Sequence, residues 1–159
     1  MLKFATGDGC TELIDTYCGS GLFALCAASS FAQVLGVEIS EKAIDAAKKN
    51  AALNNITNAQ FISGVSEDIF GLASQKIPLA KRDNAVVIID PPRAGCDERF
   101  LSQLFKFGPK KLVYVSCDPA TQARDAKVIA ANGYRVVDVT PFDLFPQTRH
   151  IENVMVFMR

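Results

Sequence analysis

A thiol and a carboxylate stand beside apolar runs in the second half of the sequence. Cys117 follows the run Leu112–Ser116 and precedes Asp118-Pro119, a helix-start signal. A thiolate at such a place can attack an electron-poor carbon. Glu152 enters the apolar run that closes the sequence, where a carboxylate loses hydration and becomes a stronger base. The two residues predict nucleophilic catalysis with a general base; the alternative is an inert packed cysteine and a solvated strand-end charge.

A stiff loop supplies two more charged groups. Asp90-Pro91-Pro92-Arg93 follows a continuous Val and Ile run, and the prolines fix φ, so the turn projects Asp90 and Arg93 beyond the strand. The loop is similar to the (D/N)-P-P-(Y/F) loop of methyltransferases that modify exocyclic amines. Arg93 replaces the aromatic residue, which argues against an amino-group target. A plain Asp-Pro-Pro turn is the structural alternative.

A glycine loop in the first half predicts a nucleoside cofactor. The first strand-like run leads through Tyr17, Gly19 and Gly21 into a helix that begins at Leu22, so backbone can approach a ligand closely. Glu38 ends the next strand-like run, where a carboxylate can accept hydrogen bonds from ribose hydroxyls. A tight turn and a solvated acid are the structural alternative.

Two cofactors fit this loop. Gly19-x-Gly21-x-x-Ala24 matches the loose dinucleotide fingerprint, which keeps NAD open. The bulky Leu22-Phe23 would crowd a pyrophosphate, whereas S-adenosylmethionine carries no phosphate. The sequence therefore favours S-adenosylmethionine.

The elements that position these residues alternate along the chain. Strands are predicted at Glu12–Tyr17, Gln33–Glu38, Ala59–Ile62, Ala85–Asp90, Lys111–Cys117, Arg135–Thr140 and Glu152–Met158. Helices are predicted at Leu22–Ser30, Glu41–Asn54, Glu98–Phe107 and Ala120–Asn132. Most strands are continuous apolar runs, as in strands covered on both faces. The pattern predicts an α/β fold with a doubly wound, mostly parallel, seven-stranded Rossmann-like sheet that ends in an antiparallel hairpin.

The composition of the chain narrows the class of protein to which it can belong. The 159 residues are 49% apolar and form one predicted domain, residues 1–159, which excludes a disordered chain. Five cysteines without a C-x-x-C pair predict free thiols and no metal site. The sequence shows neither a membrane-length apolar run nor a secretion signal, so we expect an intracellular protein. Net charge is zero, but the second half is positive, so a polyanion is expected there.

Together these motifs resemble the catalytic domain of the RNA uracil-5-methyltransferases. The matching segments are D-x-Y-C-G-x-G, V-E-I-S, I-I-D-P-P-R-A-G, V-Y-V-S-C-D-P-A-T and F-P-x-T-x-H-I-E-x-V. Within the family the eukaryotic transfer-RNA branch is the most similar. The resemblance implies S-adenosylmethionine as the methyl donor and a uridine of RNA as the target: a tRNA T-loop uridine first, a ribosomal RNA site second.

The resemblance also implies roles for individual residues. Cys117 is the nucleophile that adds to carbon 6 of uracil, and Glu152 is the base that removes the proton from carbon 5. Arg93 and Asp90 bind the pyrimidine. Cofactor contacts fall on Tyr17, Gly19, Gly21, Leu22, Glu38 and Asp90. Leu22 and Val65 replace polar residues that some members have, so side-chain contacts there are not implied.

Two other functions remain open at this point. One is an NAD-dependent oxidoreductase, and the other is an inactive RNA-associated Rossmann-like domain in which Cys117 and Glu152 only pack. Full-length family members carry additional N-terminal parts, often with an RNA-binding β-barrel. We therefore expect this sequence to be a fragment of a longer protein.

Overall fold

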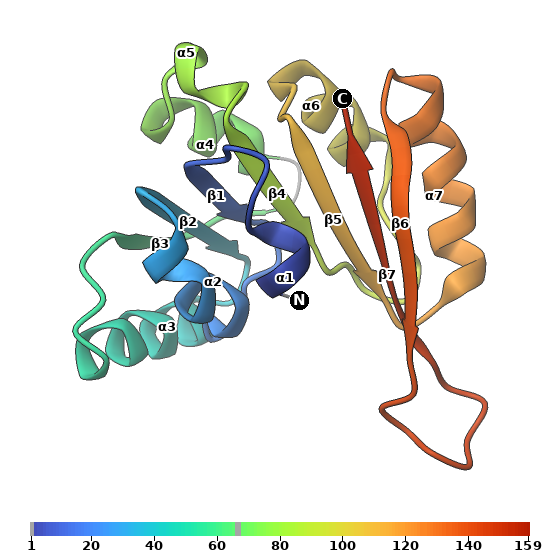
Figure 1. Cartoon of the computed structure of the whole chain (residues 1–159). Helices are drawn as coiled ribbons and strands as arrows, with labels where there is room; N and C mark the ends of the chain where they lie inside the picture. The colour runs from blue at the N-terminus through green and yellow to red at the C-terminus, as the bar shows by residue number, and fades with distance from the viewer. Residues whose placement is uncertain (1, 66–67) are drawn as a thin grey trace.

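The computed structural model describes residues 2–65 and 68–159, which form a seven-stranded sheet in the order β3-β2-β1-β4-β5-β7-β6 (Figure 1). The strands are β1 Glu12–Asp15, β2 Gln33–Glu38, β3 Ala59–Ser63, β4 Ala85–Ile89, β5 Lys111–Ser116, β6 Arg135–Phe142 and β7 Glu152–Met158. The first five strands are parallel to one another, whereas β7 runs antiparallel to both β5 and β6. The predicted fold class is confirmed.

The strand order changes direction at β1, which lies between β2 and β4. Open α/β sheets bind ligands at this kind of reversal, in the crevice beyond the carboxyl ends of the strands. The β6–β7 connection projects past the same edge of the sheet (lower right in Figure 1). The fold therefore gathers the predicted site residues on one edge.

Helices cover both faces of the sheet. They are α1 Leu2–Ala5, α2 Leu22–Ala27, the 3₁₀ turn η1 Ala28–Ser30, α3 Glu41–Leu53, α4 Ile69–Lys76, α5 Leu79–Arg82, α6 Glu98–Phe107 and α7 Pro119–Ala131. One core lies under α4, α6 and α7, and a second lies under α1, α2 and α3. Each is built from alternate residues of the same strands, which explains why β4 and β5 are apolar throughout.

Three helices are capped at their starts by the side chain of the preceding residue. The hydroxyl of Ser40 accepts a hydrogen bond from the Ala43 amide, and a carboxylate oxygen of Asp97 accepts one from the Phe100 amide. Asp118 accepts from the amides of Ala120 and Thr121. These caps fix where α3, α6 and α7 begin.

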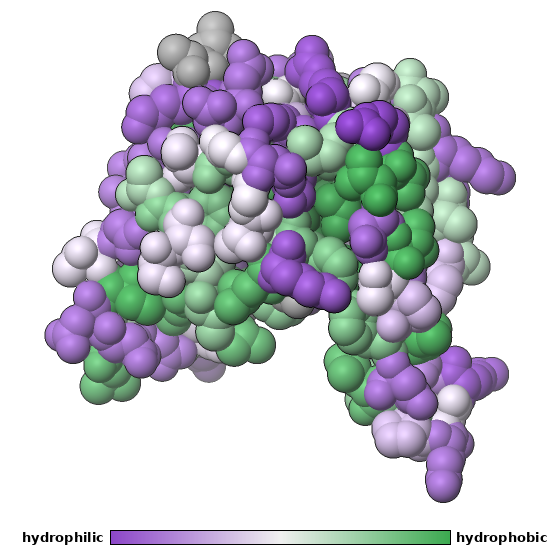
Figure 2. All heavy atoms as spheres, in the orientation of Figure 1, coloured by the Kyte–Doolittle hydropathy of each residue, from purple (hydrophilic) through white to green (hydrophobic). Residues whose placement is uncertain are grey.

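Helices α1, α4 and α5 were not predicted from the sequence, and β6 extends two residues beyond the predicted Arg135–Thr140. Each missed helix spans at most eight residues, and α4 is held by burial of Ile69 and Phe70 in the core rather than by strong start signals. β6 is an edge strand with Val137 and Val139 exposed, so it is not covered on both faces. Figure 2 shows apolar surface over this end of the sheet.

No helix among the described residues has the length and apolar character needed to cross a membrane.

Candidate active site at the carboxyl edge of the sheet

The predicted site residues converge because their strands end together. The register pairs Asp15 at the end of β1 with Gly36 of β2 and Ile88 of β4, so these three parallel strands finish at similar heights. Tyr17, Glu38, Asp90 and Cys117 lie at or just beyond the ends of β1, β2, β4 and β5. Glu152 begins β7, which enters the sheet from the same edge.

Cys117 and Glu152 adjoin the same residue pair at the end of the β5–β7 ladder. The last paired residues are Ser116 and Asn153; Cys117 follows Ser116, and Glu152 precedes Asn153. Both side chains are partly exposed, so a ligand can reach them. The insertion of β7 beside β5 therefore brings two residues that are far apart in the sequence to the same end of one strand pair.

The side chain of Gln122 in α7 is hydrogen-bonded to both β5 and β7. Its side-chain amide donates to the carbonyl of Tyr114 at 2.9 Å and to the carbonyl of Asn153 at 3.2 Å. The Asn153 amide donates in return to the Gln122 carbonyl oxygen at 2.6 Å. Both Gln122 and Asn153 are buried, so the bonds are protected from water. The helix that follows Cys117 thus also holds the residue that follows Glu152.

A cavity of about 460 Å³ occupies the reversal between β1, β2 and β4. It is lined by Thr16, Tyr17, Glu38, Ile39, Gly64, Ile69, Asp90, Pro91 and Pro92. Tyr17, Glu38 and Asp90 were predicted as cofactor residues from the sequence. Thr16, Ile39, Gly64 and Ile69 were not, although Gly64 directly follows the end of β3, where the carboxyl-edge rule would have pointed.

The glycine loop lies beside this cavity without lining it. The amide of Gly19 donates to the Glu38 carboxylate at 3.2 Å, and the amide of Ser40 donates to its other oxygen at 3.0 Å. Gly21 has φ 90° and packs against Phe61 and Ala47, which leaves little room for a side chain. Leu22 is 65% exposed and is not among the residues that line the cavity. In this structure the loop therefore acts on the cavity chiefly by orienting Glu38.

Two carboxyl groups near the cavity have raised pKa values. Complete burial raises the pKa of Asp15 to about 7, opposed by hydrogen bonds from the amides of Ala24 and Tyr17. Burial, with a smaller contribution from the negative charge of Glu152, raises the pKa of Asp90 to about 6. Oδ1 of Asp15 has no hydrogen-bond partner among the described residues. Perturbed carboxyl groups of this kind are typical of functional sites.

The donor set of the cavity fits an adenosine group. Apolar side chains of Ile39 and Ile69 offer walls for a base, and the carboxylate of Glu38 retains acceptor positions for hydroxyl groups. Asp90 offers a second carboxylate at the other side of the reversal. A carboxylate-rich cavity favours a positively charged ligand over a pyrophosphate.

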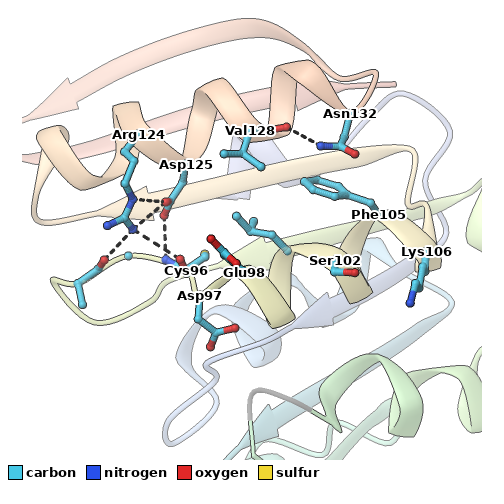
Figure 3. Close-up of a pocket in the computed structure, with 13 residues that line it drawn as sticks. Cys96, Asp97, Glu98, Ser102, Phe105, Lys106, Arg124, Asp125, Val128 and Asn132 are labelled. Carbon is cyan, nitrogen blue, oxygen red and sulfur yellow. Dashed lines mark hydrogen bonds and ion pairs between the residues drawn. The ribbon is translucent and has the colours of Figure 1, made fainter.

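A larger hollow of about 1100 Å³ lies elsewhere, between α6 and α7 (Figure 3). Its lining includes Cys96, Phe105, Arg124 and Asp125 but none of the predicted catalytic or cofactor residues. Asp125 and Arg124 point across it toward the loop that follows β4. Of these two cavities, the smaller has strand-end carboxylates and adjoins the glycine loop, which makes it the candidate cofactor cavity.

Arg93 lies outside both cavities, in the exposed part of the loop after β4. Its Nη2 atom lies 3.2 Å from Nδ1 of His150, which belongs to the projecting β6–β7 connection. Only Pro91 and Pro92 separate Asp90 from Arg93, so the same loop borders the cofactor cavity and the surface beside it. In Figure 2 a notch separates the projecting connection from the rest of the lower edge.

Comparisons with known proteins agree with this arrangement. The sequence model of the tRNA (uracil-5-)-methyltransferase family matches residues 2–159. An uncharacterized RNA methyltransferase of Bacillus cereus is 44% identical over 99% of this chain and 34% of its own length. The tRNA (uracil(54)-C(5))-methyltransferase of Schizosaccharomyces pombe is 41% identical over 92% of this chain and 28% of its own length.

A solved structure shares the fold closely. The Pyrococcus abyssi tRNA (uracil-54, C5)-methyltransferase in complex with S-adenosyl-L-homocysteine superposes with a TM-score of 0.82 and 31% identity. The match covers 99% of this chain and 36% of that one. The chain thus spans about a third of the length of the curated relatives it matches. Bacterial and fission yeast relatives match at similar identity, so the eukaryotic branch stays a prediction.

Proposed function

Since the chain belongs to the tRNA (uracil-5-)-methyltransferase family, we propose that it transfers a methyl group from S-adenosylmethionine to carbon 5 of a uridine in RNA. The observation that carries the proposal is the β5–β7 register, whose last pair, Ser116 and Asn153, is adjoined by Cys117 and Glu152. A nucleophile and a base are needed on one substrate ring, and the register brings the two candidate residues to one end of the strand pair. The family match and the two similar tRNA enzymes support the choice of RNA as substrate.

Cys117 has the first task in the proposed mechanism. Carbon 5 of uracil is too weakly nucleophilic to accept a methyl group directly. The Cys117 thiolate adds to carbon 6, forming an S–C bond, and the electrons of the ring double bond shift to give an enolate with carbanion character at carbon 5. The cysteine follows the end of β5 and precedes the first turn of α7, so backbone on both sides holds its sulfur in place.

Arg93 and Glu152 have the next two tasks. A guanidinium beside a uracil oxygen stabilises the negative charge of the enolate. Carbon 5 bonds to the methyl group as the methyl–sulfur bond of the donor breaks. Glu152 then removes the carbon 5 proton, and the electron pair that is left expels the Cys117 sulfur from carbon 6. Cys117 and Glu152 must therefore both reach the same ring, as the register allows.

The cavity at the strand reversal is the proposed cofactor site. S-adenosylmethionine supplies an electrophilic methyl group on a positively charged sulfur. Glu38 is placed to accept the ribose hydroxyls, and Asp90 to attract the positive charge, while Tyr17 lines the wall between them. The amide of Gly19 orients Glu38, Gly21 with its positive φ allows the tight turn into α2, and Leu22 lies at the exposed start of that helix.

The proposed RNA substrate is a transfer RNA, and the proposed target is its T-loop uridine; the names of the two similar tRNA enzymes give uracil 54 as their target. A base in a folded loop must leave its stack before a cysteine can reach carbon 6. The projecting β6–β7 connection and Arg93 border the place that such a base would enter. Further RNA contacts are proposed to come from an N-terminal region of a longer protein.

The direct test uses radiolabelled methyl donor and an unmodified tRNA transcript. Incorporation of label, with 5-methyluridine identified by mass spectrometry of the nucleosides, is the expected result. A second transcript with cytidine at position 54 tests the T-loop assignment and should remain unlabelled. Labelling of another nucleoside, or of neither transcript, would overturn the proposed reaction.

A further inference from the structure

Arg93 lies in a loop that has no regular secondary structure of its own. Residues 90–97 connect β4 to α6, and the amide of Gly95 donates to the carbonyl of Pro92 at 2.8 Å, which makes Arg93 and Ala94 the centre of a turn. The Arg93 side chain is exposed. A long cationic side chain on such a turn samples many conformations unless other elements hold it.

Helix α7 holds the backbone of this turn. The hydroxyl of Thr121 donates to the Arg93 carbonyl at 3.0 Å, and Nη2 of Arg124 donates to the Ala94 carbonyl at 2.8 Å. A carboxylate oxygen of Asp125 accepts from the Cys96 amide at 2.8 Å (Figure 3). Three backbone groups of this loop, on Arg93, Ala94 and Cys96, are therefore hydrogen-bonded to α7.

The Asp125 carboxylate is rigid because the interior holds it as well. It accepts a 2.7 Å hydrogen bond from the hydroxyl of Tyr114 in β5 and a 2.9 Å bond from Nε of Arg124. Asp125 is 1% exposed, and a Cβ atom added at Gly95 would lie 2.5 Å from its Oδ2. The turn thus fits against a buried network that also includes the strand leading to Cys117.

The Arg93 side chain is held from the other direction. Its guanidinium can only donate, so Nδ1 of His150 is the acceptor in this 3.2 Å contact. The His150 amide donates to the Thr148 hydroxyl at 3.1 Å, and the ring of His150 meets Phe145 edge-on. His150 stands two residues before Glu152, so its position is tied to the start of β7.

We propose that Thr121 and His150 are positioning residues, which fix the backbone and the guanidinium of Arg93 so that it meets the oxygen of a uracil whose carbon 6 faces Cys117. The inference rests on the proposed function and deepens it. Thr121 lies in the helix that follows Cys117, and His150 in the segment that leads to Glu152. Arg93 is thereby connected through Thr121 to the helix that follows Cys117 and through His150 to the segment that leads to Glu152.

Paired substitutions separate positioning from packing. His150→Phe keeps the ring and removes the acceptor, whereas His150→Asn restores an acceptor near the position of Nδ1. Thr121→Val removes the hydroxyl at nearly constant volume, and Thr121→Ser restores it. We expect the turnover number to fall roughly ten- to a hundredfold in His150→Phe and about tenfold in Thr121→Val, with recovery in the conservative variants. Affinity for S-adenosylhomocysteine should stay unchanged in all four.

Thr57→Val is the matched control for Thr121→Val. Thr57 is exposed and lies between α3 and β3, away from the site, so its loss should leave turnover unchanged. The decisive measurement is a double-mutant cycle with Arg93→Ala. If His150 acts through Arg93, then His150→Phe has no further effect on turnover once Arg93 is gone. Independent, multiplying effects would overturn the proposal.

A second readout does not depend on catalysis. Nitrogen-15 relaxation of the Arg93 side chain should report an ordered guanidinium in the wild-type protein and a mobile one in His150→Phe. An Arg93 that is equally mobile in both overturns the positioning role even when the enzyme methylates RNA. An ordered Arg93 in a protein that methylates no uridine instead overturns the proposed function and leaves the contact standing.

Discussion

Ser116 of β5 pairs directly with Asn153 of β7, and each is followed or preceded by a residue of the proposed chemistry. Cys117 comes one residue after Ser116, and Glu152 comes one residue before Asn153. Because the two strands are antiparallel, these two offsets place both residues just beyond the same end of the ladder. The spacing of 35 positions in the sequence is therefore less informative than the register, which a slip of one residue would destroy.

Replacing Cys117 with alanine should abolish methyl transfer, because no thiolate remains to activate carbon 5. Affinity for S-adenosylhomocysteine should remain close to that of the wild type, since Cys117 does not line the cofactor cavity. Cys26→Ala removes an exposed cysteine of α2 and serves as the control. Methylation by the Cys117 variant would show that the reaction proceeds without a covalent adduct.

Glu152→Gln should trap protein on RNA. Addition of the thiolate and methyl transfer both precede removal of the carbon 5 proton, so a variant without the base stops at the adduct. A denaturing gel should show a slow band that nuclease treatment removes. Glu98→Gln, an exposed change in α6, should give no such band. A Glu152 variant that turns over normally is incompatible with its role as the base.

The raised pKa of Asp90 predicts a pH-dependent cofactor affinity. With a pKa of about 6, its carboxyl group is mostly neutral at pH 5 and charged at pH 8. A charged carboxylate attracts the sulfonium, so wild-type affinity for S-adenosylmethionine should rise over this interval, by about tenfold. Calorimetry on Asp90→Asn should give a nearly flat profile. An equally steep rise in the variant would assign the effect to another group.

The raised pKa of Asp15 predicts that removing the charge of its carboxylate stabilises the protein at high pH. Its pKa is about 7 in the folded state and 3.8 by reference in the unfolded state, so the folded state binds more protons between these values. The free energy of unfolding therefore falls as pH rises from about 4 to about 7. Asp15→Asn should be more stable than the wild type at pH 8 by about 1–3 kcal/mol and similar to it at pH 4.

Urea unfolding at the two pH values measures this difference. The Asn side chain can still accept the hydrogen bond from the Ala24 amide, which spans 3.2 Å in the wild type. The stability gain is consequently expected from the removal of charge alone. A gain of equal size at pH 4 and pH 8 would point to packing instead.

Gly95→Ala should destabilise the protein more than Gly7→Ala. Both glycines have positive φ, at 79° and 87°, so an alanine at either costs about 1 kcal/mol in backbone strain. A Cβ atom at Gly7 meets nothing within 4 Å, whereas one at Gly95 would lie 2.5 Å from Oδ2 of Asp125. In thermal unfolding, the free energy of unfolding of Gly95→Ala should therefore be lower than that of Gly7→Ala by about 1–3 kcal/mol. An equal loss of stability in the two variants would show that the turn rearranges to accept the Cβ atom without a further loss of stability.

The sequence predicted the sheet well because its strands are buried apolar runs. β2 and β7 begin and end where their patterns predicted, and α6 does so because Asp97 and Gly108 mark both of its ends. Pattern reasoning failed where structure depends on distant contacts. α4 has no capping side chain, and its burial against α6 is visible only after folding.

The candidate site divides in the same way. Tyr17, Glu38 and Asp90 were found because they stand at strand ends, which sequence alone can locate. Leu22 was placed at the cofactor by its position in a motif, although its side chain is exposed and outside the cavity. The contact between Arg93 and His150 joins residues that are 57 positions apart, so no local sequence pattern could predict it.

The position of β7 between β5 and β6 has a consequence for how the site is completed. β6 reaches the rest of the sheet only through β7, so neither strand of the hairpin joins the sheet until β7 pairs with β5. A partly folded chain with β1 to β5 in place would already have the strand ends that line the nucleoside cavity, but Glu152 would not yet have reached the edge at which Cys117 lies. If the two residues act as proposed, such a chain could hold the methyl donor without completing a turnover.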